Sequence, residues 1–581
     1  MHSMARRSLP SYTQTGPFSF ASFRILMTAL SPRCYPSDSQ SPGQPPEPKL
    51  TMPLRPRAIV LAATLFAATL PAVTLPAQTT PTRQIQADAS HIVGPHSQTP
   101  LMTAGAGRAN EGLRADWQQQ LSTVQQEIGF KYLRFHGLLH DDMGVYTEDA
   151  KGNPSYNFQY IDALYDALLA HHIRPFVELS FMPAKLASGP NTVFWWKANI
   201  TPPKDMDKWN GLIRALIEHW RERYGEQEIT QWYYEVWNEP DLSVFWSGTH
   251  QQYFDLYRNT AETIKAVCTR CRVGGPASAG NDLQPEWLAY ITANHIPADF
   301  LSTHTYGVTS GAFDADGHTG TILDASPDSI VKRVRDSRSL IDSSTTPKLE
   351  LHYTEWSTSY TPTDPIHDQY ISAAFILEKL RETSPLAQSM SYWTFTDIFE
   401  ENGPRFTPFH GGFGLINYQG IRKPAFFAYK FLAQLGPNDI VTNDPESWIT
   451  KSADGSVQAL FWNYTPVAPP TGESDQIFYK KEQPAKPASP TNLKITGLSN
   501  GTYTLNIYRT GYQQNDAYTA YLHMGSPNQL TRPQVASLQS AASGAPTETR
   551  TISIKNDTFD QTFEMHENDT VLVTLKKRES H

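Results

Sequence analysis

The sequence predicts a (β/α)8 barrel followed by an all-β sandwich, and three observations support this fold class. Between about residues 100 and 435, short apolar segments alternate with amphipathic helical segments, as in repeated strand–helix units. After residue 435 the pattern changes to short strands separated by Gly, Pro, Asn and Ser. The length of 581 residues also exceeds what one compact core needs and suits two domains.

The first part of the chain is interpreted as a leader that precedes the barrel. Residues 52–77 have the order of a secretory signal peptide, with Arg55 and Arg57 before an apolar centre and small residues at the exit. The apolar run is shorter than the ~20 strongly apolar residues of a spanning helix, so we expect no stable membrane anchor. Residues 1–51 are rich in Pro and Ser, and a signal peptide should begin near its own N-terminus, so we expect translation to start at Met52. The mature protein is therefore expected to be exported, either to the periplasm or out of the cell.

The barrel is assigned to residues 100–435. Eight segments there have the length and apolar character of buried parallel strands, and six segments between them repeat apolar residues at helical spacing. The predicted strands are 101–105, 132–136, 175–181, 232–238, 272–276, 300–306, 349–355 and 389–395. The predicted helices are 117–128, 160–171, 207–224, 253–267, 329–341 and 370–382.

Residues 436–581 are assigned to the sandwich, and residues 78–99, before the barrel, are expected to add a strand to it. A domain that covers one flank of the barrel is favoured over an independent carbohydrate-binding domain. The Pro-rich segment 466–490 is expected to be an exposed loop. The predicted sandwich strands are 456–464, 492–498, 501–509, 548–554 and 569–575.

Charge and cysteine content exclude some classes of function. The net charge of −9 provides no basic surface, so nucleic acid is not an expected partner. Cys268 and Cys271 form a lone CxxC, whereas structural zinc needs about four ligands, so no metal site is expected. The pair is expected to be a local disulfide or two inert thiols. The sequence leaves the oligomeric state open, a homo-oligomer included.

Two of the predicted strands end in a glutamate. The segment YYEVWNEPD places Asn238 and Glu239 after the fourth strand, and LELHYTEW ends the seventh strand at Glu355. Because the active site of a (β/α)8 barrel lies at the C-terminal ends of its strands, both carboxyl groups should face one cleft. Such a pair indicates glycoside hydrolysis. Enzymes that retain the anomeric configuration hold their two carboxyls about 5–5.5 Å apart, and enzymes that invert it hold them about 6.5–9.5 Å apart. The sequence does not measure that separation.

Nine motifs follow one another in order between residues 130 and 435. They are RFHGLLHDDMGVY, FVELSFMPAKLASG, NITPPKD, EVWNEPDL, VGGPA, STHTY, TEWSTSY, SYWTFTDIFEE and FHGGFGL. With these motifs the chain resembles glycoside hydrolase family 39, most closely its β-xylosidases. Many retaining barrel glycosidases share the Asn-Glu step, so the number and order of the other motifs make the resemblance specific. The resemblance implies that Glu239 is the acid/base and Glu355 the nucleophile of a retaining mechanism.

The same motifs imply a sugar-binding pocket. In it, Asn238 would bond the sugar 2-OH, Tyr306 would orient the nucleophile, and Arg134 would stabilise the ionised form of Glu355. Trp393 would form an apolar platform under the sugar ring. The implied pocket residues are His136, Phe181, Asn238, His304, Tyr306, Tyr360, Trp393 and Glu400.

Some positions temper this assignment. Without the resemblance, His136 and His304 would be interpreted as packed core histidines. Trp356 stands where Tyr is common after the nucleophile, and Phe135 replaces a Gly before His136. These departures put the fine specificity in question more than the catalysis.

The sequence thus predicts an exported, retaining exo-glycosidase that removes β-linked xylose from xylo-oligosaccharides, as in xylan degradation, with no metal or cofactor. An α-L-iduronidase-like, β-glucosidase-like or arabinoside-cleaving enzyme would share both glutamates. A uronate pocket should add a cation, and Glu400 and the aromatics favour a neutral pentose, with Arg405 the nearest basic residue. A non-catalytic carbohydrate-binding barrel is disfavoured because both glutamates are retained.

Overall fold

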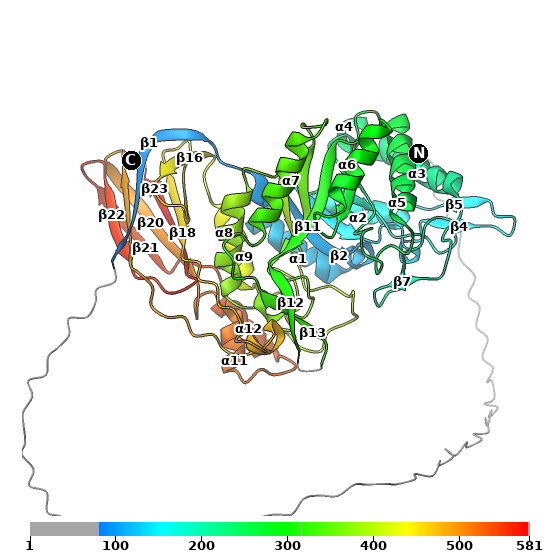
Figure 1. The fold of residues 1–581 in the computed structure, drawn as a ribbon. Helices are drawn as coiled ribbons and strands as arrows, with labels where there is room; N and C mark the ends of the chain where they lie inside the picture. Colours follow the sequence, from blue (N-terminus) through cyan, green and yellow to red (C-terminus); the bar gives the residue numbers. More distant parts are fainter. Residues whose placement is uncertain (1–80, 315–316, 579–581) are drawn as a thin grey trace, which may run out of the picture. The chain divides into compact units, whose positions relative to one another are not determined.

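The computed structural model describes residues 81–314 and 317–578, which form a closed barrel and a nine-stranded sheet (Figure 1). The predicted signal peptide and the predicted start at Met52 lie outside the described residues. Within the described ranges, no helix combines the length and apolar character needed to cross a membrane.

Eight parallel strands close the barrel, so the predicted (β/α)8 fold is confirmed. Neighbouring strands follow the chain order, and β15 pairs with β2 to complete the ring. Each observed strand overlaps one of the eight predicted segments. The strands are β2 (Thr103–Arg108), β3 (Tyr132–His136), β6 (Arg174–Leu179), β9 (Tyr233–Val236), β10 (Arg272–Ser278), β11 (Phe300–Tyr306), β14 (Glu350–Ser357) and β15 (Ser389–Tyr392).

Eight helices alternate with these strands, two more than were predicted. The unpredicted helices are α6 and α9, and α9 has buried residues all around it. It therefore lacks the one-sided apolar pattern that marks an amphipathic helix. The helices are α1 (Ala115–Glu127), α2 (Gln159–Ala170), α3 (Met206–Tyr224), α5 (His250–Val267), α6 (Gln284–Ala293), α7 (Val331–Ser343), α8 (Ile371–Thr383) and α9 (Pro424–Ala433).

The barrel interior is apolar at one end and polar at the other. Tyr132, Phe176, Tyr233 and Phe300, near the starts of four strands, form one buried aromatic cluster. Side chains alternate along a strand, so the residue two positions further also points inward. That position holds Arg134 in β3 and a glutamate in both β6 and β9. The strand sequences therefore place a charged layer directly above an aromatic plug.

The nine-stranded sheet forms the second domain, and the predicted sandwich is confirmed. In it, β1 from the segment before the barrel lies between β16 and β19. Phe461 of β18 and Phe563 of β22 are far apart in the strand order, yet their rings are 5.4 Å apart, so two parts of the sheet face each other. The strands are β1 (Arg83–Pro95), β16 (Asn438–Thr442), β17 (Ser447–Lys451), β18 (Val457–Trp462), β19 (Thr491–Thr496), β20 (Gly501–Thr510), β21 (Glu548–Ile554), β22 (Phe559–Phe563) and β23 (Thr570–Lys577).

Strand β18 joins the two domains because both of its faces are apolar. Val457, Ala459 and Phe461 belong to the core of the sheet. Leu460 and Trp462, on the other face, belong to the barrel core. The indole Nε1 of Trp462 donates to Glu378 Oε2 of α8 at 2.8 Å. The sheet thus packs on the barrel through a strand that is buried on both sides.

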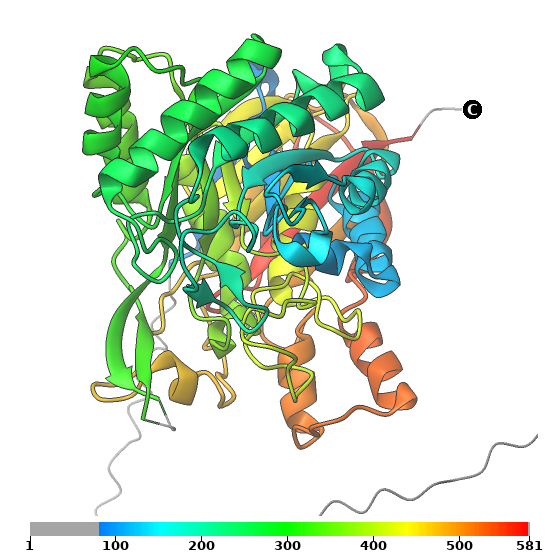
Figure 2. The same cartoon turned by 90° about the vertical axis from the view of Figure 1, so that its right-hand side faces the viewer.

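The expected exposed loop 466–490 is instead partly buried, and that prediction is wrong. It contains the short helix α10 (Asp475–Phe478), which lies beside the hairpin of β12 (Val308–Phe313) and β13 (Thr319–Leu323), as Figure 2 shows in gold and green. Asp475 accepts from Leu323 N at 3.1 Å, and Gln476 Oε1 accepts from Thr321 N at 3.0 Å. The segment is buried there because the side chains of Asp475 and Gln476 accept hydrogen bonds from main-chain N–H groups of the hairpin. The Pro content of segment 466–490 gave no sign of these bonds.

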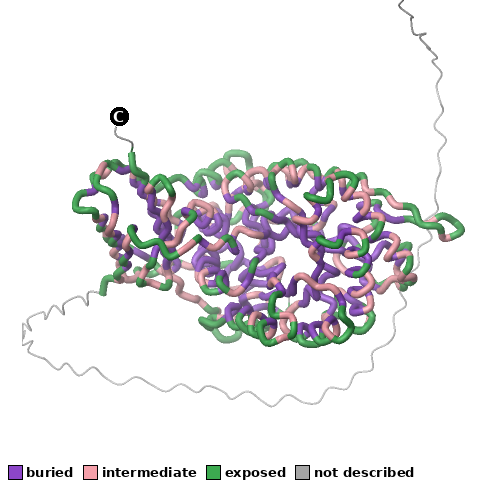
Figure 3. Tube along the Cα trace, turned by 90° about the horizontal axis from the view of Figure 1, so that it is seen from above, coloured by how far each residue is buried: buried purple, intermediate pink, exposed green. Residues whose placement is uncertain are grey.

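Three further features complete the fold. Helices α11 (Ala517–His523) and α12 (Arg532–Ala541) interrupt the second domain, so its chain is not purely β. Cys268 and Cys271 form a disulfide between α5 and β10. Buried residues occupy the interior of the molecule, and most exposed ones lie on loops and outer turns (Figure 3).

Candidate active site

A buried guanidinium organises the C-terminal end of the barrel. Arg134 is fully buried, and its nitrogens contact Glu235 at 2.5 Å and Glu178 at 2.9 Å. They also contact Glu355 Oε1 and Asn238 Oδ1, each at 2.8 Å. A guanidinium presents its donors in a fixed plane, which suits several acceptors at once. Arg134 therefore fixes Glu355 and Asn238 relative to each other.

Both carboxylate oxygens of Glu355 accept hydrogen bonds. Oε1 accepts from Arg134, and Oε2 accepts from the Tyr306 hydroxyl at 2.6 Å. The Glu355 side chain is only 6% exposed. Hydrogen bonds to a carboxylate are short and about twice as strong as neutral ones. They stabilise the negative charge and aim the remaining lone pairs into the cavity, as a nucleophile requires.

The backbone turns sharply at the end of β9 to present Glu239. Trp237 and Glu239 have φ of +74° and +45°, in the left-handed region that costs a non-glycine residue about 1–3 kcal/mol. Glu239 N donates to Ala277 O at 2.7 Å, and Trp237 Nε1 donates to Phe245 O at 3.0 Å. These bonds hold the strained turn and point the Glu239 carboxyl into the barrel mouth.

The environment of Glu239 suits a proton donor. Burial, and then the negative charge of Asp241, raise the pKa of Glu239 to about 8. Its Oε1 lies 2.8 Å from Nδ1 of His304, and burial lowers the pKa of His304 to about 4. At neutral pH the histidine is therefore uncharged and Glu239 holds its proton.

The two glutamates are close neighbours. One carboxylate oxygen of Glu239, one of Glu355 and a ring nitrogen of His304 lie within 4.8 Å of one another. Within residues 81–314 and 317–578, these are the acidic and histidine groups spaced so that they could hold a metal ion. Glu239 and His304 are already hydrogen-bonded to each other through Oε1 and Nδ1. The close carboxyls can also act on one glycosidic bond by themselves.

Both carboxyls open into a cavity of 630 Å³. Its wall is built from the ends of the barrel strands and from the loops that follow them. The lining residues are His136, Asn238, Glu239, Leu242, Phe245, Ala279, Tyr306, Val308, Thr309, Ser310, Arg333, Glu355, Tyr360, Trp393, Glu401 and Phe413.

Most of the predicted pocket residues lie on this wall, and two stand behind it. His304 is fully buried and reaches the site through its bond to Glu239. Phe181 is also fully buried and packs on the rings of His136 and Trp237 at 6.0 and 5.4 Å. The predicted residues that line the cavity beside the two glutamates are His136, Asn238, Tyr306, Tyr360 and Trp393.

Glu400 does not line this cavity, whereas its neighbour Glu401 does. The Glu400 carboxylate is bound by Arg108 at 3.3 Å and Arg114 at 2.8 Å. Glu401 Oε1 lies 3.5 Å from Nε2 of His136. Burial, and then the charges of Glu355 and other carboxylates, raise the pKa of Glu401 well above its usual range. The pocket carboxyl of this loop is therefore Glu401, which sequence reasoning missed because nothing local distinguishes two adjacent glutamates.

Other lining residues were missed although they lie inside the motifs. Leu242 ends EVWNEPDL and Phe413 lies in FHGGFGL, so both were within reach of the sequence. Phe245 and Arg333 lie outside every motif, and only the folded chain brings them to the wall.

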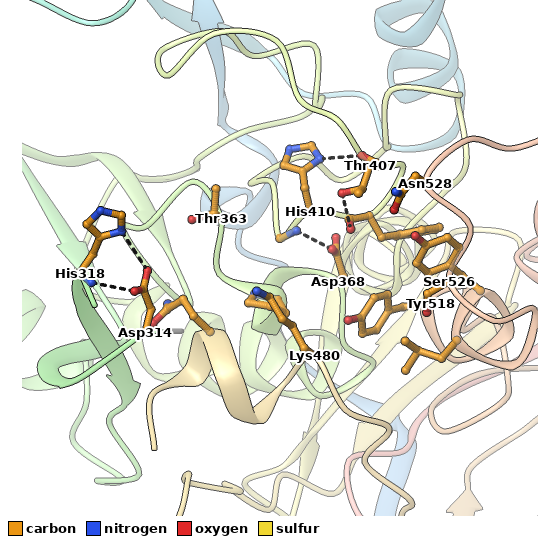
Figure 4. A pocket seen from close by; sticks show the side chains of 16 residues that line it. Asp314, His318, Thr363, Asp368, Thr407, His410, Lys480, Tyr518, Ser526 and Asn528 are labelled. Carbon is orange, nitrogen blue, oxygen red and sulfur yellow. Dashed lines mark hydrogen bonds and ion pairs between the residues drawn. The ribbon is translucent and has the colours of Figure 1, made fainter. Parts of the chain in front are cut away.

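A second cavity, of 530 Å³, lies where barrel loops meet the segments around α10 and α11 (Figure 4). Its carboxylates are already engaged. Asp314 pairs with His318, and Asp368 binds the buried Lys423 at 2.7 Å. It therefore offers no close pair of carboxyls, and the 630 Å³ cavity is the candidate active site.

The glutamate pair in a barrel mouth agrees with the comparisons to known proteins. The family model of glycosyl hydrolases family 39 matches residues 84–558. The chain belongs to glycoside hydrolase family 39. This confirms the resemblance inferred from the motifs, and the protein is a glycoside hydrolase.

Similar family 39 proteins match most of the chain. A β-xylosidase from Geobacillus stearothermophilus is 39% identical over 455 residues, which cover 77% of this chain and 86% of that protein. The structure of a monomeric β-xylosidase from Caulobacter crescentus CB15 matches with a TM-score of 0.83 and 42% identity, over 85% of this chain and 100% of that one. The family 39 enzyme from Xanthomonas axonopodis pv. citri matches with a TM-score of 0.84 and 44% identity, over 86% and 98%.

Proposed function

We propose that this family 39 enzyme is a retaining exo-β-xylosidase that releases xylose from the non-reducing ends of xylo-oligosaccharides. The observation that carries the mechanism is the distance of at most 4.8 Å between carboxylate oxygens of Glu239 and Glu355. Retaining enzymes hold their carboxyls about 5–5.5 Å apart, whereas inverting enzymes leave about 6.5–9.5 Å for a water molecule. The close spacing supports direct attack by a carboxylate.

In the first step Glu355 attacks the anomeric carbon while Glu239 gives its proton to the leaving oxygen. The C–O bond to the aglycone breaks, and a covalent xylosyl–Glu355 ester forms. In the second step Glu239, now ionised, takes a proton from water, which attacks the same carbon and releases Glu355. Asn238, held by Arg134, is placed to bond the sugar 2-OH in both steps.

The inner end of the cavity favours a neutral sugar. Three carboxyl groups line it, from Glu239, Glu355 and Glu401. The cation beside them, Arg134, is already bound to four acceptor side chains. A uronate would therefore meet carboxyls and no free cation there, which counts against an iduronidase-like activity. Arg405 does not line this cavity, and it contributes to the wall of another one.

Exo action is supported by the closed inner end. His136 and Trp393 are each only 2% exposed, and their rings lie 4.7 Å apart behind the sugar position. Such a wall leaves room for a terminal sugar and not for a chain that continues past it. The β-xylosidase relatives support xylose as that sugar.

The test is hydrolysis of a panel of para-nitrophenyl glycosides by the protein from Gln78 onward, including β-D-xyloside, β-D-glucoside, α-L-arabinopyranoside and α-L-iduronide. The xyloside should be cleaved fastest, and proton NMR should show β-xylose as the first product. Another preferred glycoside would overturn the substrate, first-formed α-xylose would overturn the retaining mechanism, and silence on the panel and on xylo-oligosaccharides would favour a non-catalytic carbohydrate-binding barrel.

We also propose that the enzyme is exported by a signal peptide at residues 52–77. The support is the order of charged, apolar and small residues in that segment. N-terminal sequencing of the exported protein should begin near Gln78, and a start upstream of Met52 would contradict the proposal.

A further inference from the structure

The two ends of the active-site cavity differ in the side chains that line them. Its inner end holds the carboxyls of Glu239, Glu355 and Glu401. Its outer end is lined by apolar and hydroxyl side chains and by a single basic residue of the wall, Arg333 at the start of α7. The outer lining consists of Leu242, Phe245, Ala279, Val308, Thr309, Ser310 and Arg333.

The outer end lies on the side of the acid/base glutamate. Leu242 N donates to Glu239 O at 3.0 Å, and Glu239 N donates to Ala277 O, two residues before Ala279. Asn281 Nδ2 of the same loop donates to Arg333 O at 3.0 Å, which ties α7 to this side. Since the acid/base must reach the leaving oxygen, the outer end faces the leaving group and not the released sugar.

Arg333 is exposed, and its guanidinium makes no hydrogen bond or ion pair with any residue that the structure describes. Its neighbours on the helix are paired: Lys332 binds Asp336 at 2.5 Å, and Arg335 binds Asp328 at 3.5 Å. Thr309 and Ser310, which line the same cavity, are exposed residues as well. The leaving-group end therefore offers one free guanidinium next to hydroxyls and an apolar floor.

We propose, on the basis of the proposed xylosidase function, that this end binds an acidic sugar in the leaving group and that Arg333 binds its carboxylate. A guanidinium pairs with a carboxylate through two parallel hydrogen bonds, and Leu242 and Phe245 can contact the apolar face of a ring. At the inner end, the carboxylate of Glu355 disfavours an anion at the terminal-sugar position, where no cation is free to bind it. The substrate class is thus a xylo-oligosaccharide whose second xylose carries a uronic acid.

The experiment compares two forms of one oligosaccharide, a xylotriose that carries glucuronic acid on its middle xylose and the same compound with the carboxyl reduced to an alcohol. The wild-type enzyme should cleave the acidic form with a kcat/KM about two- to fivefold higher at low salt, as expected for an exposed ion pair. Arg333→Ala should remove this preference and Arg333→Glu should reverse it. Arg335→Ala, on the same helix, should keep it.

Neutral xylotriose and para-nitrophenyl β-xyloside separate this inference from the proposed function. The acidic and reduced forms are compared within each variant, so a general change in activity does not affect the test, and a wild-type midpoint of thermal unfolding shows that the Arg333 variants are folded. Equal rates on the two forms in the wild type, or a preference that survives in Arg333→Ala, would overturn the acidic subsite alone. Failure of the wild type on both neutral compounds would overturn the proposed function and the subsite with it.

Discussion

Two pairs of buried carboxyl groups in this molecule have different environments. Glu239 and Glu355 meet at the barrel mouth, and Asp364 and Asp475 meet where the loop after β14 contacts α10. Each pair joins residues far apart in the sequence, and both aspartates are fully buried. The glutamates open into the 630 Å³ cavity, whereas neither aspartate lines it.

The partners of each pair explain what it can do. Arg134 and Tyr306 stabilise a negative charge on Glu355, while burial keeps Glu239 protonated, so one member can attack and the other can donate. In the aspartate pair, burial raises the pKa of both groups, and the charge of Asp364 raises that of Asp475 further. The glutamate pair is suited to catalysis because its two members differ in protonation state and face a cavity. The aspartate pair faces no such cavity and lies between two segments of the chain.

The largest effect is expected from Glu355→Gln. The amide cannot attack the anomeric carbon, so kcat on para-nitrophenyl β-xyloside should fall by about 10⁴-fold or more, as when other nucleophiles are removed. The midpoint of thermal unfolding should change little, because the amide oxygen still accepts a hydrogen bond. Full turnover by this variant would show that the nucleophile is another group.

Glu239→Ala should have an effect that depends on the leaving group. Loss of a general acid costs about 10²- to 10⁴-fold where the leaving oxygen needs a proton. Xylobiose hydrolysis should therefore fall strongly, while aryl xylosides with acidic phenols should still form the xylosyl-enzyme and show a burst of phenol. An equal loss on all leaving groups would contradict the acid/base role.

The pH dependence sharpens the contrast between the two glutamates. Because Glu239 must be protonated to donate and its pKa is raised to about 8, kcat/KM for xylobiose should fall about tenfold per pH unit above that value. The fall should weaken for an aryl xyloside whose phenol leaves unprotonated. A descending limb at the same pH and steepness for both substrates would assign that limb to another group.

The smallest effect is expected from Asp475→Asn, which tests the non-catalytic pair. Burial and the charge of Asp364 raise the pKa of Asp475 to about 9, so the folded state keeps a proton that the unfolded chain releases from about pH 4 upward. This contribution to stability is therefore lost as pH rises toward 9. Between about pH 5 and 8 the free energy of unfolding should decline by about 1–3 kcal/mol less in the variant than in the wild type.

Urea unfolding at a series of pH values measures how steeply the free energy of unfolding declines with pH. Asp560→Asn, on an exposed aspartate of the sheet, is the matched control and should keep the wild-type slope. An identical dependence of the unfolding free energy on pH in Asp475→Asn would show that Asp475 does not keep this proton in the folded state. Activity at neutral pH should be nearly unchanged, since Asp475 does not line the active site.

The sequence by itself determined the eight barrel strands and the glutamate at the end of two of them. Both are local signals, because an apolar run of strand length and the residue that ends it are read directly from the chain. The longer strands of the sheet, such as β18 and β20, were also predicted. The five-residue strands β16, β17 and β22 were not, since segments so short carry little alternation and are stabilised by their partners.

Tertiary structure decided which side chains the chemistry would use. Glu400 and Glu401 are chemically identical in the sequence, and Glu400 is bound by Arg108, the last residue of β2, and by Arg114, which follows that strand. The segment 466–490 was buried by bonds to a hairpin about 150 residues earlier in the chain. Ion pairs and hydrogen bonds between distant segments depend on geometry that no local pattern encodes, so only the folded chain could select Glu401 for the active site.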